Sequence, residues 1–287
     1  MILVTGATGH VGGALVSELA AAQQPVRAMT RRPHATAFPP GVDVVHGDCD
    51  DPGSLDAAFH GADRAFLMSS QATGTAERPT HIEALVEAAR RAGVHHVMHL
   101  SVYSGGGGGD AISVWAGQSE AAVTGSGMEW TLLRPGRFMS NALQWAPMIR
   151  RGDTVTIPFA GRAAASIDPA DVAAVALVAL TTEGHRAVAH QLSGPQVLTP
   201  TDELRILAET LGRRLHPVEP PIGSVEAGML AAGLPRPVVD AILARTLDSD
   251  EGTQILPTVT EILGRPPATF AHWAGTHAEL FTGTDPD

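Results

Sequence analysis

A glycine-rich turn directly after the first apolar run constrains the fold of this chain more than any other feature. The run Ile2-Leu3-Val4 leads into Thr5-Gly6-Ala7-Thr8-Gly9-His10-Val11-Gly12, and a stretch of helical length extends from Val11 to Gln23. Glycines at these spacings permit a tight turn, a pyrophosphate close to the backbone and close packing of helix on strand. The pattern predicts the start of a dinucleotide-binding sheet. The alternative is a glycine-rich turn in an α/β domain without a ligand.

Short apolar runs alternate with stretches of helical length over the first 135 residues. The predicted strands lie at 2–4, 26–29, 42–45, 65–68, 96–100 and 131–133, and the predicted helices at 11–23, 54–60, 79–92 and 111–124. Asp51-Pro52 is typical of a helix start, and Gly93 of a helix end. Strands separated by single helices imply parallel βαβ units. We therefore predict an α/β fold with a Rossmann-type doubly wound parallel sheet.

The pattern loosens after Pro135. Helices are expected at 141–151, 169–181, 201–211, 224–232, 237–244 and 257–263, with a strand at 155–157. We expect a dinucleotide-binding Rossmann domain over residues 1–150, with a return segment at about 163–195. A smaller, mainly helical C-terminal lobe from about 196 to 287 would cover the substrate. Segments near Asn141 and Thr154 are expected to return to this lobe.

Charge and composition exclude several classes of partner. The net charge of −11 repels nucleic acid and anionic membranes. No apolar run reaches the roughly 18 residues that span a bilayer, and the N-terminus lacks the pattern of a signal peptide. The single cysteine, Cys49, excludes an intrachain disulfide and a zinc site built on several cysteines. The chain is expected to be cytoplasmic, with no nucleic-acid or membrane partner. The sequence leaves a homodimer open.

The residues after the second predicted strand determine the choice of cofactor. An NAD enzyme usually has Asp or Glu there to bind the ribose 2′-hydroxyl. This chain has Thr30-Arg31-Arg32 instead, and no acidic residue between Glu18 and Asp43. Two guanidinium groups suit a 2′-phosphate. We predict NADPH as the cofactor, with NADH less favoured, unless both arginines are solvated loop residues.

Other cofactor contacts are expected at the carboxyl ends of the strands, where ligands bind to such sheets. Asp48 and Cys49, after the third strand, are placed to meet the adenine. Ser69, Ser70 and Gln71, after the fourth, would lie near the ribose of the nicotinamide. Both segments have ordinary loop capping as an alternative. The glycine turn contributes Gly6, Thr8, Gly9, His10, Val11 and Gly12.

Several segments together resemble the NmrA-like group of atypical short-chain dehydrogenases. They are the TGATGHVGG start, Arg31, Gly47-Asp48, the run from Leu132 to Asn141, and Ile167-Asp168-Pro169-Ala170-Asp171-Val172-Ala173. The resemblance extends over nearly the whole chain. It implies a quinone or dye reductase, or a redox-sensing regulator that binds NADP without turnover. It also implies that Pro135, Gly136, Arg137 and Phe138 pass the nicotinamide ring.

The absence of lysine limits the chemistry. All 19 basic residues are arginine, so the Tyr-x-x-x-Lys pair of short-chain dehydrogenases is missing, and Gly107 stands four residues after the only tyrosine, Tyr103. A lysine general acid and a lysine Schiff base are excluded as well. Quinones accept hydride readily and take protons from water or a weak donor. The missing pair therefore favours easily reduced, conjugated acceptors.

Candidate pocket residues come from the loops after the fourth, fifth and sixth strands. Tyr103, Gln118 and Ser101 are the candidate catalytic hydrogen-bonding groups. Trp115, Asn141 and Trp145 are the candidate substrate contacts, since tryptophan stacks on flat rings, although either tryptophan could be core. Gly105–Gly109 would form a mobile flap or a disordered loop. We predict no metal, because His95 and His99 share one strand face and His96 the other.

Three functions follow as hypotheses. The first is an NADPH-dependent reductase of a quinone or other small polycyclic aromatic substrate. The family resemblance implies a variant in which the reduced quinone is then hydroxylated by oxygen in an aromatic polyketide pathway, with the chain as the reductase part of a monooxygenase. A composition typical of a GC-rich genome fits this variant. The second is an NADP-sensing NmrA-like regulator without turnover. The third is an azo, dye or imine reductase.

Overall fold

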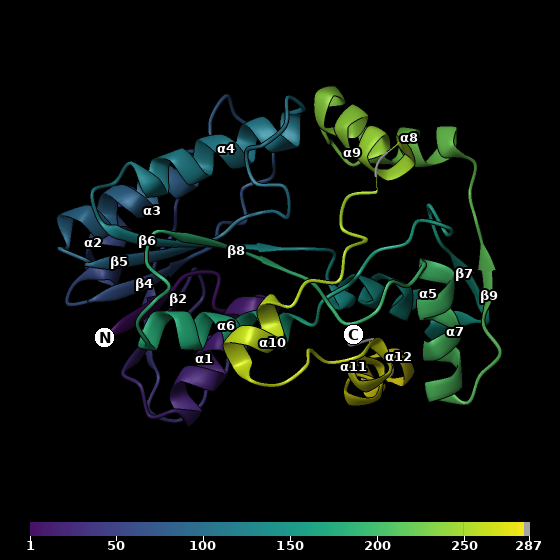
Figure 1. Cartoon of the computed structure of the whole chain (residues 1–287), viewed down its shortest axis with the longest axis horizontal. Helices are drawn as coiled ribbons and strands as arrows, with labels where there is room; N and C mark the ends of the chain where they lie inside the picture. Colours follow the sequence, from purple (N-terminus) through teal and green to yellow (C-terminus); the bar gives the residue numbers. More distant parts are fainter. Residues whose placement is uncertain (249, 284–287) are drawn as a thin grey trace. The chain divides into compact units, whose positions relative to one another are not determined.

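The computed structural model describes residues 1–248 and 250–283 and divides the chain into two compact units. Unit 1 comprises Met1–Pro135 and Pro169–Leu192, and unit 2 comprises Gly136–Asp168 and the chain from Ser193 onward (Figure 1). Residues 136–150, expected in the first domain, pack with unit 2. In the described part of the chain, no helix has both the length and the apolar character needed to cross a bilayer.

Seven parallel strands form one sheet in unit 1, in the order β3-β2-β1-β4-β5-β6-β8. They are β1 (Ile2–Val4), β2 (Val26–Thr30), β3 (Asp43–His46), β4 (Arg64–Leu67), β5 (His96–Leu100), β6 (Glu129–Pro135) and β8 (Val188–Leu192). The six predicted strands and the Rossmann-type fold are confirmed. The strand β8 was not predicted, because it is an edge strand in which half-buried and exposed residues alternate.

Helices cover both faces of this sheet (Figure 1). On one face α1 (His10–Ala21) packs against α6 (Pro169–Thr181). The other face carries α2 (Pro52–Phe59), α3 (Thr80–Arg91) and α4 (Ala111–Thr124). The strand order reverses between β1 and β4, so ligands are expected beyond the carboxyl ends of these two strands.

Unit 2 is mainly helical around a core that includes Trp145, Ile149, Phe270, Trp273 and Phe281. A short parallel pair joins β7 (Thr154–Thr156) to β9 (His216–Val218). The helical elements are the 3₁₀ helix η1 (Met139–Trp145), α5 (Ala146–Arg151), α7 (Pro200–Leu211), α8 (Ile222–Ala231), α9 (Arg236–Asp248), α10 (Thr258–Leu263), α11 (Phe270–Thr276) and α12 (Glu279–Thr282). This confirms the predicted mainly helical character.

The helix predicted over 141–151 is divided in the structure. A 3₁₀ segment ends at Trp145, and the α-helix begins at Ala146 with Pro147 in its first turn. Proline has no N–H, so it cannot continue an α-helical ladder from the preceding turn, but it fits the first turn of a new helix.

Candidate functional site

The glycine turn between β1 and α1 is held by Thr5. The Thr5 N–H donates to the Phe66 carbonyl (3.0 Å), and its hydroxyl donates to the Met68 carbonyl (2.9 Å) and accepts from the Met68 N–H (2.7 Å). Gly6 has φ +60°, and a Cβ at Gly12 would lie 2.2 Å from the Gly6 carbonyl oxygen. The helix α1 therefore begins in close contact with the turn. Its N-cap, Gly9, has no side chain to occupy the first N–H groups, which leaves them for a phosphate.

A pocket of about 250 Å³ lies at this end of the sheet in unit 1. It brings together most of the predicted cofactor residues, namely Gly6, Thr8, Gly9, Arg31, Arg32, Asp48, Cys49, Ser69 and Ser70. His10, Val11, Gly12 and Gln71 do not line it. The sequence analysis missed Met68, which adjoins the predicted Ser69, and Thr36 and His81, which local sequence patterns do not single out.

Arg31 and Arg32 are the charged groups of this pocket that remain available. Both are exposed, and neither side chain has an ion-pair or hydrogen-bond partner within residues 1–248 and 250–283. Of the other arginines, all but Arg214 donate a hydrogen bond to a carboxylate or carbonyl oxygen, or form an ion pair, within the described part of the chain. Two unpaired guanidinium groups beside a glycine cradle fit a dinucleotide with a 2′-phosphate.

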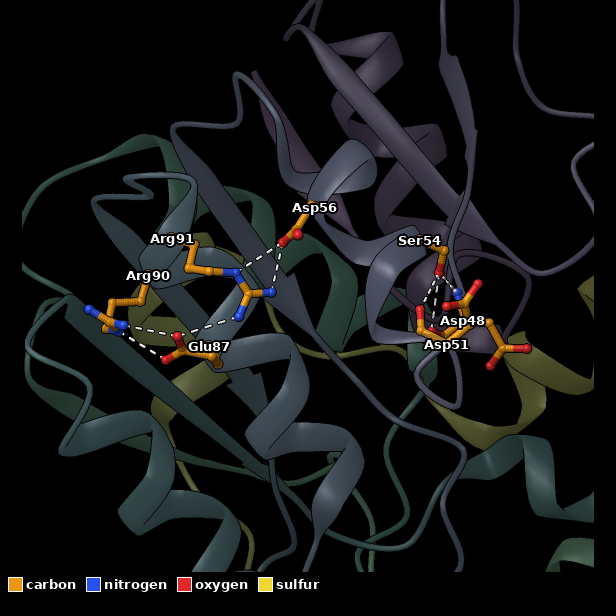
Figure 2. A network of polar contacts seen from close by, with 7 residues as sticks. All are labelled: Asp48, Asp51, Ser54, Asp56, Glu87, Arg90 and Arg91. Carbon is orange, nitrogen blue, oxygen red and sulfur yellow. Dashed lines mark hydrogen bonds and ion pairs between the residues drawn. The ribbon is translucent and has the colours of Figure 1, made fainter.

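The segment after β3, which lines the pocket, forms a turn that is closed by hydrogen bonds. Figure 2 shows the Ser54 hydroxyl accepting from the Asp48 N–H (2.9 Å) and donating to the Asp51 carbonyl (2.7 Å). Burial, together with the nearby carboxylates of Asp48 and Asp50, raises the pKa of the Cys49 thiol to about 11. The thiol therefore stays protonated at neutral pH and acts as a pocket wall, not as a nucleophile.

Ion pairs fasten α3 to the neighbouring helix. In Figure 2 the Arg91 guanidinium binds Asp56 of α2 (2.7 Å), and Arg90 and Arg91 both bind Glu87. These pairs are largely exposed, so each contributes little to stability.

A second hollow of about 150 Å³ adjoins the first, and Ser69 lines both. Besides Ser69, it brings together three further predicted site residues, Gln71, Ser101 and Trp115. The Gln71 side chain, however, donates to Thr80 (3.0 Å) and accepts from the His81 N–H (3.0 Å). Gln71 thus ties its loop to the start of α3. Tyr103 and Gln118 are half-buried and line neither hollow, so their catalytic roles stay predictions.

A buried ion pair lies behind Ser101. The Ser101 hydroxyl donates to Glu120 (2.6 Å), and Arg134 donates to both oxygens of the same carboxylate (2.9 and 2.6 Å). Burial alone would raise the pKa of Glu120, but the hydrogen bonds from Arg134 and Ser101 outweigh it, and the pKa lies below its usual value. Because its proton is committed to Glu120, the Ser101 hydroxyl is oriented to accept, not donate, a further hydrogen bond.

Part of the glycine run after β5 lies close to β6 and α4, and whether the run moves as a flap stays a prediction. A Cβ at Gly105 would lie 2.5 Å from the Arg134 guanidinium, and one at Gly106 would lie 2.5 Å from the Gly117 Cα. Glycine permits this close approach of loop and helix backbones. Gly109, at the end of the run, has open space around it.

Unit 2 contains a separate cavity of about 830 Å³. The chain enters unit 2 directly from β6, and Arg137 stands two residues beyond Pro135, the last residue of that strand. Arg137 and the predicted substrate contacts Asn141 and Trp145 line this cavity. Asn141 is exposed, whereas Trp145 is 3% exposed and also packs in the core. Trp115 belongs to unit 1.

Arg137 is already neutralised within unit 2. Its guanidinium donates to Glu203 (2.7 Å) and to the Ser166 hydroxyl (2.8 Å), and Ser166 in turn donates to Glu203 (2.8 Å). Burial raises the pKa of Glu203, while the positive charge of Arg137 opposes the rise. Gly136 and Phe138 flank Arg137 in unit 2, and Phe138 forms a β-bridge to Ile167. Cofactor contacts by Pro135–Phe138 stay predictions.

The histidines of β5 have partners inside the fold. His96 hydrogen-bonds to the Thr131 hydroxyl (2.9 Å), and His99 to the Leu67 carbonyl (3.2 Å). Across the described ranges, no three His, Cys, Asp or Glu side chains gather as a metal site would require.

Fold and pocket together define a nucleotide-binding protein of the Rossmann type, and comparisons with known proteins agree. A family described as NAD(P)H-binding matches residues 6–183. A (4-alkanoyl-5-oxo-2,5-dihydrofuran-3-yl)methyl phosphate reductase of Streptomyces griseus is 39% identical over 98% of this chain and 99% of the relative. An NAD(P)H azoreductase of Xenophilus azovorans is 33% identical over the same shares of the two chains, 98% and 99%.

Among solved structures, the NADPH-dependent quinone oxidoreductase of Escherichia coli in complex with NADPH has the same fold. Its TM-score is 0.76 at 24% identity, over 96% of this chain and 99% of that one. The chain belongs to the NAD(P)H-binding family, and it is an NAD(P)H-dependent oxidoreductase. The resemblance to NmrA-like atypical short-chain dehydrogenases is confirmed.

Proposed function

We propose that this chain is an NADPH-dependent reductase that transfers hydride to an electron-poor conjugated carbonyl compound. Quinones and α,β-unsaturated lactones both belong to this class. The observation that carries the proposal is the unpaired guanidinium pair, Arg31 and Arg32, at a pocket built on the glycine turn. Those two arginines would hold the 2′-phosphate, and the N-terminus of α1 would hold the pyrophosphate.

The acceptor class follows from what the chain lacks and from its relatives. When bound, NADPH supplies the hydride. The chain contains no lysine to activate a tyrosine, and Ser101 is committed to Glu120. An acceptor whose conjugation stabilises the negative charge needs no strong acid beside it. The relative from Streptomyces griseus is named for a 5-oxo-2,5-dihydrofuran substrate, which is an unsaturated lactone, and another relative is a quinone oxidoreductase.

The test is NADPH oxidation by purified protein against 1,4-naphthoquinone, a 3-alkanoyl butenolide and an azo dye, with NADH as the competing cofactor. We expect fast, NADPH-selective oxidation with the quinone or the butenolide. Selective turnover of the azo dye would make the chain a dye reductase instead. Tight NADPH binding with no acceptor consumed would contradict the proposal and favour an NADP sensor.

The variant that the family resemblance implies, quinone reduction followed by hydroxylation of an aromatic polyketide, requires oxygen as a co-substrate. Its test repeats the quinone assay under nitrogen and in air. Oxygen uptake in proportion to NADPH, with a hydroxylated product, would support a monooxygenase step. Equal NADPH consumption and an unhydroxylated hydroquinone in both atmospheres would restrict the chain to reduction.

A further inference from the structure

The helix α8 is mostly apolar, yet none of its residues is buried. Its sequence is Ile-Gly-Ser-Val-Glu-Ala-Gly-Met-Leu-Ala, and Ile222 and Leu230 are 49% and 38% exposed. Val225, Gly228 and Met229 line the cavity of unit 2, whereas Ile222 and Leu230 do not. An apolar helix normally buries one face, so the face with the half-buried Val225 and Met229 gains from an apolar occupant of the cavity.

The same cavity has a cationic wall at Arg162. The Arg162 side chain is 22% exposed and donates to the Glu251 carbonyl (3.1 Å). Its nearest carboxylate, on the fully exposed Asp250, lies 4.0 Å away, at the outer limit of an ion pair. A largely buried guanidinium with so distant a counter-charge is incompletely neutralised and favours an added anion.

The remaining charges of the cavity do not cancel Arg162. Arg137 and Glu203 form a close pair (2.7 Å) and neutralise each other. The rest of the cavity lining is mostly apolar and includes Trp145, Ile157, Phe159 and Ile242. The cavity thus has one incompletely neutralised charge, at Arg162, and a mostly apolar lining.

We propose that the cavity of unit 2 binds an amphiphilic substrate, with an alkyl or acyl chain along α8 and an anionic phosphate or carboxylate group at Arg162. The assignment deepens the proposed reductase function by giving its conjugated substrate two further groups. The volume of the cavity, about 830 Å³, lies within the range of small-molecule sites.

The direct test measures binding without turnover. Calorimetry would compare octyl phosphate, octanoate, butyl phosphate, octanol and inorganic phosphate on the full chain. Octyl phosphate or octanoate should bind most tightly, and affinity should rise about threefold to fourfold per added methylene that is buried. Arg162→Gln should lower the affinity for the anionic ligands by about tenfold or more and leave the affinity for octanol unchanged. Arg162→Lys should restore part of the lost affinity.

Two control variants separate the site from general damage. Arg214, like Arg31 and Arg32, has no partner in the described chain, and it lines another hollow. Arg214→Gln should therefore change the affinity for neither octyl phosphate nor octanol. Gly228 and Gly223 both lie in α8 with open space around them, and of the two only Gly228 lines the cavity. Gly228→Phe should therefore block chain binding, whereas Gly223→Phe should not.

The outcomes distinguish this inference from the proposed function. If 1,4-naphthoquinone consumes NADPH but octyl phosphate and octanoate bind no better than inorganic phosphate, the reductase stands and the cavity assignment fails. If both amphiphiles bind but Arg162→Gln and Gly228→Phe leave their affinity unchanged, they bind elsewhere and the assignment also fails. Amphiphile binding that depends on both residues, without NADPH turnover, would support the site and contradict the reductase.

Discussion

At the scale of single residues, we propose that Arg31 and Arg32 determine the preference between the two nicotinamide cofactors. Replacing both by alanine removes the charge that would meet a 2′-phosphate and leaves the glycine turn intact. We expect NADPH to bind about 10-fold to 100-fold more weakly and NADH to be unaffected, because one or two charge-assisted hydrogen bonds are lost. Titration of each cofactor by calorimetry measures this. Arg214→Ala is the control, and an equal loss for both cofactors would contradict the role.

The sequence identifies residues whose function depends on backbone geometry or on a fixed place after a strand. Gly6, Gly9, Arg31 and Asp48 fall into this group, and the structure places all four at one pocket. The sequence could not indicate that Ser101 is bound to Glu120 or that Arg137 is neutralised by Glu203, since those partners are distant in sequence. Charge pairs of this kind depend on the folded chain.

The Glu120–Arg134 pair makes stability depend on pH. The pKa of Glu120 is lower in the folded chain than in the unfolded one, so its contribution is present above the unfolded pKa and is lost as pH falls through the folded pKa. We expect Glu120→Gln to cost about 3 kcal/mol at neutral pH, with a smaller difference from wild type in acid. Urea unfolding over a pH series measures this.

The control for that experiment is Glu129→Gln, which breaks an exposed pair with Arg186 (2.9 Å). Its effect should stay below about 1 kcal/mol. If both variants lose the same stability at every pH, the buried carboxylate of Glu120 does not act as an ion.

At the scale of elements, the close approach of the glycine run to α4 can be tested with two matched substitutions. Gly106→Val would place a Cβ 2.5 Å from the Gly117 Cα, whereas Gly109→Val meets nothing within 4 Å. We expect the first variant to lose roughly 1–3 kcal/mol and the second to be nearly neutral. Thermal unfolding of the two variants checks this. Equal stability would mean that the run is a loose flap after all.

Elements with a strong apolar pattern and clear caps were predictable to the residue. The helices α4 (Ala111–Thr124) and α6 (Pro169–Thr181) have the predicted bounds, and Asp110 caps α4 through its side chain. The strands β8 and β9 escaped prediction because their exposed residues give them no continuous apolar run. Their pairing depends on neighbouring strands, which local sequence does not specify.

At the scale of the whole molecule, each of the two units contains a pocket of its own. Unit 1 holds the glycine pocket and its unpaired arginines, and unit 2 holds the larger, mostly apolar cavity. The sequence predicted a nucleotide domain and a helical lobe but not the point at which the chain passes between them. That point follows Pro135, where the last residue of β6 leads into η1. This crossing point depends on the packing of the Trp145 segment in the unit 2 core, which is a long-range property.

The central claim is that hydride passes from NADPH to a conjugated carbonyl compound. The most direct measurement uses NADPH carrying two deuterium atoms at C4 of the nicotinamide, with a 3-alkanoyl butenolide as acceptor and mass spectrometry of the product. The account predicts one deuterium, bonded to the carbon β to the carbonyl groups, and slower oxidation than with unlabelled NADPH. Hydrogen from solvent at that carbon, or no reduced product with NADPH fully bound, would contradict it.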